Sequence, residues 1–174
     1  MPTLAQLQKI WLLSDTVLYP EAVAFIRRLV EKEGCNPLPA SQVNGLFSIA
    51  ESSRYGELRR FVEHQRDRDW QPSKRDIKTF YTRLEQELTR MERRLAVEFR
   101  LTKDEHGRPV SDTDQNEMLA LLAREFIQHV IAENGVIAAE SGDQYRAKQR
   151  AGGQPQQRSG GRDGNQWSNR SRGA

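Results

Sequence analysis

One apolar stripe constrains the fold of this chain more than any other feature of its sequence. Between Ser73 and Leu101, apolar residues recur three and four positions apart, and on a helical wheel they fall within an arc of about 100°. The stripe consists of Ile77, Phe80, Tyr81, Leu84, Leu88, Met91, Leu95 and Phe99. No Gly or Pro interrupts it after Ser73, a residue suited to an N-cap. The pattern therefore predicts an amphipathic helix of about 28 residues, long for a globular domain.

The charges of this segment are sorted around the stripe. Four glutamates flank the apolar residues, namely Glu85, Glu87, Glu92 and Glu98. Arginines lie toward the opposite pole of the wheel, namely Arg75, Arg83, Arg90, Arg93, Arg94 and Arg100. Two interpretations stay open for this basic crest. It is either a solvated surface with weak Glu–Arg pairs, or a row of guanidinium groups that follows a nucleic-acid backbone.

The rest of the chain also has helical periodicity, and no alternating β-type segment is found. Start and stop signals predict four further helices. They are expected at about Thr3–Leu13, at Pro20–Gly34, from Ser41 onward, and at Ser53–Asp69. A last helix is expected from Asp112 or Thr113 to a C-cap at Asn134 and Gly135. It is apolar nearly all round, which predicts a central position or a second face shared with another copy. The fold class is therefore all-α, a bundle of about five helices around the long central one.

Composition divides the chain into two parts. Residues 1–140 are expected to form one helical domain, since a chain of 174 residues supplies one modest core. Residues 141–174 are rich in Gly, Gln, Arg and Ser and are expected to be a disordered basic tail. No run of about 18 apolar residues and no secretory leader are found, so we expect a cytoplasmic protein without a membrane span.

Charge is segregated along the chain. Residues 54–100 hold 13 basic and nine acidic side chains, whereas residues 101–140 hold three and eight. Such segregation can direct a polyanion to one surface. The predicted RNA contacts lie on two adjacent helices and are Arg54, Arg59, Arg60, Arg66, Arg75, Lys78, Arg83, Arg90 and Arg94. They would hold a phosphate backbone without reading bases.

No motif for catalysis, a cofactor or a metal is found. The sequence has no Gly-x-Ser-x-Gly elbow, no His-Glu-x-x-His, no Cys-x-x-Cys and no Gly-rich phosphate loop, and Cys35 is its single cysteine. We therefore predict no catalytic residue, no cofactor and no metal site.

One spacing of Arg and His leaves an enzymatic alternative open. Arg124 is followed five residues later by His129, which resembles the active-site spacing of HEPN ribonucleases, themselves small helical bundles. Arg59 with His64 and Arg100 with His106 have similar spacings, and since about one such match is expected by chance among 21 arginines and three histidines, the signal is weak. His129 also lies near an apolar arc, where a core histidine is the commoner interpretation. A protein-interaction bundle that binds no nucleic acid is the third alternative.

Two short stretches resemble a known family. The segment PLPASQVNGLFSIAE, with Ser41, Gln42 and Val43, then basic helices and a final EFIQHVIAEN, is similar to the small helical subunits of type III CRISPR effector complexes. The resemblance covers roughly residues 40–137. It implies a noncatalytic subunit that stacks in several copies beside backbone subunits and offers basic residues to the guide or target RNA. The implied partners are RNA, other subunits of the complex and further copies of this chain.

Overall fold

A computed structural model describes residues 1–52, 54–104 and 106–152, with side chains up to residue 142. The elements of these residues are all helical: α1 (Leu4–Leu13), a π-helical segment η1 (Ser14–Leu18), α2 (Tyr19–Arg27), a second π-helical segment η2 (Arg28–Lys32), α3 (Ala40–Ser52), α4 (Tyr55–Asp67), a 3₁₀ turn η3 (Pro72–Lys74), α5 (Arg75–Val97) and α6 (Asp112–Gly152). Apart from one isolated bridge between Lys103 and Pro109, the described residues hold no β-structure. The predicted all-α bundle is confirmed. No helix in the described ranges has the length and apolarity to span a membrane.

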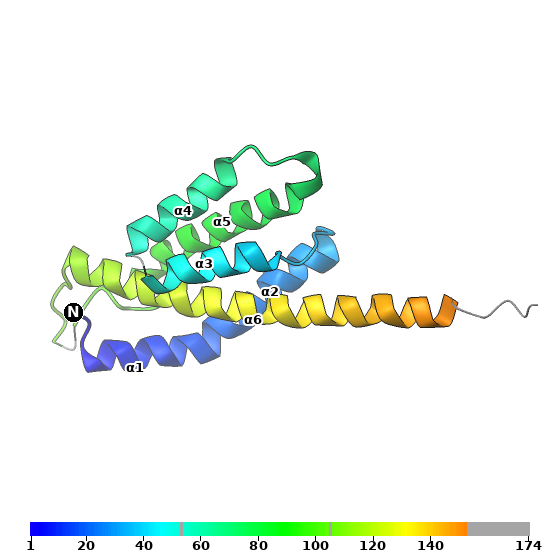
Figure 1. Cartoon of the computed structure of the whole chain (residues 1–174). Helices are drawn as coiled ribbons and strands as arrows, with labels where there is room; N and C mark the ends of the chain where they lie inside the picture. The colour runs from blue at the N-terminus through cyan, green and yellow to red at the C-terminus, as the bar shows by residue number, and fades with distance from the viewer. Residues whose placement is uncertain (53, 105, 153–174) are drawn as a thin grey trace, which may run out of the picture.

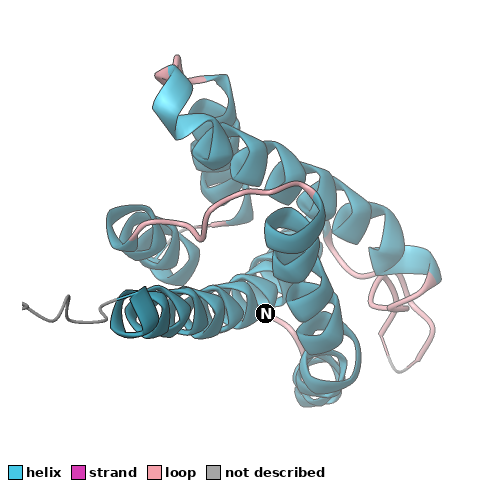
Figure 2. Cartoon of the chain, turned by 90° about the vertical axis from the view of Figure 1, so that its right-hand side faces the viewer, coloured by secondary structure: helices cyan, strands magenta, loops and turns pink. Residues whose placement is uncertain are grey.

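The central element of the bundle is α6, not the segment that carries the apolar stripe. Helix α6 contacts α1, α2, α3, α4 and α5. Figure 1 shows it running along the whole bundle, with α1 on one side and α3, α4 and α5 on the other, and then continuing beyond them. Figure 2, viewed from the side on which α6 emerges, shows the other helices above α6 and to its right. Its buried residues include Met118, Leu122 and Phe126.

Helix α5 confirms the stripe but is shorter than predicted. All eight stripe residues are buried. The helix begins at Arg75 rather than after Ser73, because Pro72–Lys74 form the 3₁₀ turn, and Lys74 at the N-cap makes no side-chain hydrogen bond. It ends at Val97, and Arg100 then takes a positive φ of 50° that turns the chain away. The helix has 23 residues in place of about 28.

The first two predicted helices form one continuous helical run from Leu4 to Lys32. One row of its buried positions recurs every four residues, at Gln6, Ile10, Ser14, Leu18, Ala22 and Ile26, and Phe25 and Leu29 are buried beside it. In an α-helix with 3.6 residues per turn, such a row drifts around the axis by about 40° at each step. The π-helical segment η1 lies within this row, and its i→i+5 hydrogen bonds make wider turns that offset part of this drift.

The predicted C-cap at Asn134 and Gly135 is wrong, because α6 continues through both residues to Gly152. The Asn134 side chain has another role: its Oδ1 accepts a hydrogen bond from the Leu38 N–H at 2.7 Å, and its Nδ2 donates to the Leu38 carbonyl at 3.1 Å. This amide ties the α2–α3 connection to α6. Residues 141–152, which the sequence analysis placed in a disordered tail, therefore extend α6, and residues 153–174 lie outside the described residues.

The helical conformation of Gly135 leads to a stability prediction. A Cβ added there would meet no atom within 4 Å, so alanine fits without strain. We expect Gly135→Ala to raise the free energy of unfolding by about 0.5–1 kcal/mol in urea denaturation, because alanine has the higher helix propensity. Gly34→Ala is the matched control and should lower it, since Gly34 has a φ of +69°. A destabilised Gly135→Ala variant would contradict a continuous α6.

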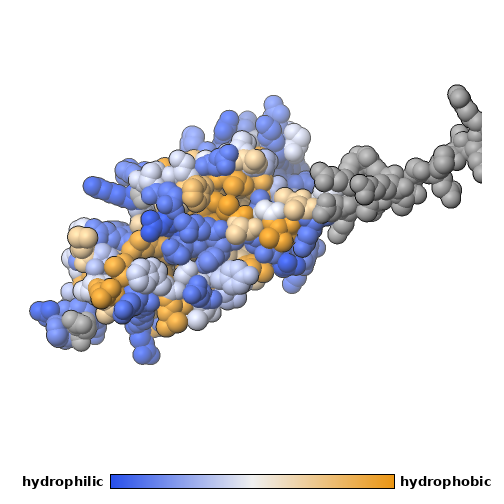
Figure 3. All heavy atoms as spheres, turned by 60° about the horizontal axis from the view of Figure 1, so that its bottom comes forward, coloured by the Kyte–Doolittle hydropathy of each residue, from blue (hydrophilic) through white to orange (hydrophobic). Residues whose placement is uncertain are grey.

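Helix α1 exposes an apolar face. Leu4, Trp11 and Leu12 are 67%, 57% and 62% exposed, and Tyr19 at the start of α2 is 51% exposed. Figure 3 looks at the side of the bundle that α1 forms and shows apolar patches there between polar residues. Because Ile10 on the other side of α1 is buried in the core, this helix has apolar side chains on both faces.

Candidate nucleic-acid interface

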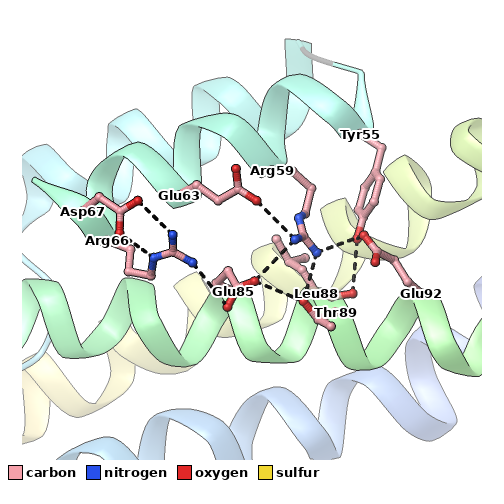
Figure 4. A network of polar contacts seen from close by, with 9 residues as sticks. All are labelled: Tyr55, Arg59, Glu63, Arg66, Asp67, Glu85, Leu88, Thr89 and Glu92. Carbon is pink, nitrogen blue, oxygen red and sulfur yellow. Dashed lines mark hydrogen bonds and ion pairs between the residues drawn. The ribbon is translucent and has the colours of Figure 1, made fainter.

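Arg59 does not belong to a basic crest, because it lies in a network of carboxylates between α4 and α5 (Figure 4). Its Nη1 donates to Glu92 Oε1 at 2.9 Å and to Thr89 Oγ1 at 3.0 Å. Its Nη2 lies 3.2 Å from Glu63 Oε1 and 3.3 Å from Glu85 Oε1. Burial opposes the charge of this guanidinium, but Glu92 and Glu63 outweigh it, so the pKa of Arg59 is raised above its ordinary value.

Arg66 and Tyr55 extend this network in both directions. Arg66 donates from Nε to Asp67 Oδ1 at 2.7 Å, and its Nη1 lies 3.7 Å from Glu85 Oε2. The Tyr55 hydroxyl donates to Glu92 Oε1 at 2.9 Å, and burial together with this carboxylate raises its pKa. The seam between α4 and α5 thus combines two guanidiniums with four carboxylates, so it does not attract a polyanion.

On its other side, α5 uses three arginines to hold the N-terminal helical run. Arg94 Nη1 donates to Glu21 Oε2 at 2.8 Å, and Arg90 Nη2 lies 3.2 Å from the same oxygen. Arg83 Nε donates to Glu33 Oε1 at 3.1 Å. These arginines therefore link α5 to α2 and to the residue that follows η2.

Two of these three arginines also pair with glutamates that are close to them in the sequence. Arg94 Nε donates to Glu98 Oε2 at 2.6 Å, and this bond lowers the pKa of the Glu98 carboxyl. Arg90 Nη2 lies 3.1 Å from Glu87 Oε2. The sequence analysis left open whether the crest is a surface with Glu–Arg pairs or a row of guanidiniums for RNA, and Arg83, Arg90 and Arg94 form such pairs. Arg59 and Arg66 of α4 are paired as well. The contact of these five arginines with RNA stays a prediction.

Four of the nine predicted contacts are exposed and form no ion pair or side-chain hydrogen bond with the described residues. They are Arg54, Arg60, Arg75 and Lys78. Arg54 is the N-cap residue of α4, and Arg60 follows in the same helix. Arg75 and Lys78 lie in the first turns of α5. The structure therefore divides the nine residues into paired and unpaired groups.

Arg54 and Arg60 line a groove of about 840 Å³ between the end of α3, the start of α4 and the first turns of α6. Arg124 of α6 also lines it, and its Nε lies 4.0 Å from Glu51 Oε1, at the limit of an ion pair. We name these three residues the groove arginines. Arg75 and Lys78 are not among its lining residues.

The groove also contains three carboxylates, two of which have other contacts. Glu51 accepts a hydrogen bond from Gln128 Nε2 at 2.6 Å, and Glu117 Oε2 lies 3.7 Å from the N-terminal nitrogen of Met1. Glu57 forms no ion pair or side-chain hydrogen bond with the described residues. Arg54 and Arg60 are thus left without a carboxylate partner at a concave surface.

The sequence analysis considered Arg124 only together with His129, and the structure separates these two residues. Arg124 faces the groove, whereas His129 Nε2 lies 2.9 Å from Ser14 Oγ and its ring packs against Tyr19 at a centroid distance of 5.4 Å. Arg124 and His129 therefore do not share a site, as the HEPN-like alternative would require.

Ser14, His129 and Glu125 form a partly buried polar cluster that has the wrong order for nucleophilic catalysis. Ser14 Oγ donates to Glu125 Oε2 at 2.9 Å and also contacts His129. In a catalytic triad the histidine lies between the serine and the acid, whereas here the serine lies between the other two. Ser14 is 4% exposed, so the cluster satisfies a buried hydroxyl at the π-helical turn. Among the described residues, no group of His, Cys, Asp or Glu could hold a metal.

Comparison with known proteins finds no matching family model, no matching curated protein and no matching solved structure.

Proposed function

We propose that this protein is a noncatalytic RNA-binding subunit of a CRISPR ribonucleoprotein effector, and that it contacts the RNA backbone through the α3–α4–α6 groove. One observation carries the RNA contact: the groove arginines converge on one concave surface, and two of them lack a carboxylate partner. The membership in a CRISPR complex rests on the resemblance of residues 40–137. It is compatible with the all-α fold.

The groove arginines fit this role better than the paired arginines of α4 and α5 do. A guanidinium is permanently charged and can donate two parallel hydrogen bonds to a phosphate. Arg54 and Arg60 can do so without first giving up a protein partner, whereas Arg59 or Arg94 would have to break several short contacts. The backbone contact is therefore expected at the groove and not along α5.

The experiment reverses the charge of the groove arginines. We expect Arg54→Glu/Arg60→Glu/Arg124→Glu to weaken binding of a labelled single-stranded RNA by about 100-fold in fluorescence anisotropy at low salt. The slope of log K against log salt should also fall by about two, because each lost phosphate contact removes roughly 0.7. Glu57→Gln removes the groove carboxylate without a partner and should tighten binding by about threefold.

Arg75→Glu/Lys78→Glu is the matched control, since both residues are exposed and unpaired but lie outside the groove. It should change RNA affinity by less than about threefold. Equal losses in the two variants would show that only net charge matters, and an unchanged affinity of the groove variant would exclude the groove as the contact.

A protein-interaction bundle is the second candidate function, and the exposed apolar face of α1 favours it. Large apolar side chains such as Leu4, Trp11 and Leu12 seldom gather on the surface of a protein without a partner. This function is compatible with a subunit in a larger complex. If the unmodified protein does not bind RNA at low salt, the interaction bundle replaces the RNA-binding subunit as the proposed function.

A further inference from the structure

The groove is lined partly by apolar side chains and partly by charged and polar ones. Its lining includes the apolar side chains of Ala50, Ala120 and Leu121, which we name the apolar floor. The groove arginines, three glutamates and small polar residues such as Ser52 and Asn116 form much of the remaining lining. A phosphate backbone alone would make no use of these apolar side chains, so the lining matches a ligand with a charged part and an apolar part.

We infer that the groove accepts an unpaired nucleotide of single-stranded RNA, with the phosphate at the groove arginines and the base on the apolar floor. This inference rests on the proposed function and adds the class of RNA. A volume of about 840 Å³ is in the range of sites that enclose small ligands, so it suits one or two nucleotides. In a duplex the bases are stacked inside the helix and cannot reach such a floor.

Gly56 supplies the position at which the inference can be tested. It lies in the first turn of α4, lines the groove, and would meet no atom within 4 Å if a Cβ were added. Because the space above it is open, a larger side chain fills the groove without displacing the core. Gly45 of α3 is also exposed with an open Cβ position, but it is not a lining residue.

The experiment measures the affinity of the full chain for a labelled single-stranded RNA and for the same strand annealed to its complement. We expect the single strand to bind at least about tenfold more tightly, and Gly56→Leu to remove most of that difference. Gly45→Leu, the matched control, should leave both affinities unchanged. Circular dichroism of each variant checks that the helices are intact.

The failures of the two proposals are distinguishable. If charge reversal of the groove arginines abolishes binding but the duplex binds as well as the single strand, the groove binds RNA and the unpaired base is excluded. The same conclusion follows if Gly56→Leu binds the single strand normally. If the unmodified chain binds neither RNA, the proposed function and this inference both fall.

Discussion

Replacing Phe126 by alanine is expected to lower the free energy of unfolding by about 3–5 kcal/mol, because it leaves a cavity at the centre of the bundle. Phe126 is 2% exposed, in the middle of the helix that contacts all the others. Its ring packs edge-on against Phe25 at a centroid distance of 5.8 Å, and Phe25 packs against Phe80 at 5.6 Å. These three rings connect α6, α2 and α5. Since domains are commonly stable by only about 5–15 kcal/mol, the loss is a large fraction of the total.

Equilibrium unfolding in guanidinium chloride, followed by circular dichroism, measures this effect. Phe47→Ala is the matched control, because Phe47 of α3 is 44% exposed and the same truncation there should cost less than about 1 kcal/mol. If the two variants lose similar, small amounts of stability, α6 does not form the core described above.

Replacing Asn134 by alanine is expected to lower the free energy of unfolding by about 2–4 kcal/mol. The Asn134 amide is the partner of both the N–H and the carbonyl of Leu38, and both of these hydrogen bonds are buried. Without it, two backbone groups stay buried without a partner, and each costs about 1–3 kcal/mol. The gain in helix propensity from alanine offsets only a few tenths of that loss.

Thermal and urea unfolding of Asn134→Ala test this prediction. Asn44 of α3 is exposed, so Asn44→Ala should change stability by less than about 0.5 kcal/mol. A neutral Asn134→Ala would mean that the α2–α3 connection is not anchored to α6 by this side chain. The Asn134-Gly135 pair would then need another explanation for its failure to end the helix.

Periodicity predicted the fold class because it reports which side chains are buried. The eight residues of the α5 stripe are all buried, as the wheel indicated. In the first 32 residues periodicity predicted the two helices but not the π-helical segment that joins them, because such a turn has no simple sequence signal. The C-cap signal at Asn134 and Gly135 was wrong because both residues stay helical, and the Asn134 side chain forms a tertiary contact with Leu38.

The candidate site was only partly predictable, because several of its contacts join residues that are far apart in the sequence. Spacings of four residues, such as Arg94–Glu98 and Arg59–Glu63, could have been recognised as pairs on a helical wheel. The contacts of Arg83 with Glu33 and of Arg94 with Glu21 span 50 and 73 residues, so they depend on how the helices pack. Arg124 belongs to the groove for the same reason. Its sequence neighbours indicate a polar position on α6 but not the nearness of Arg54.

The central claim is that RNA lies in the groove rather than along α5. Amide hydrogen exchange with and without a saturating single-stranded RNA tests it most directly, since bound RNA slows exchange where it excludes solvent or suppresses local opening. The account predicts added protection in residues 54–60 and 113–124, with residues 75–94 unchanged. Protection confined to residues 75–94 would contradict it.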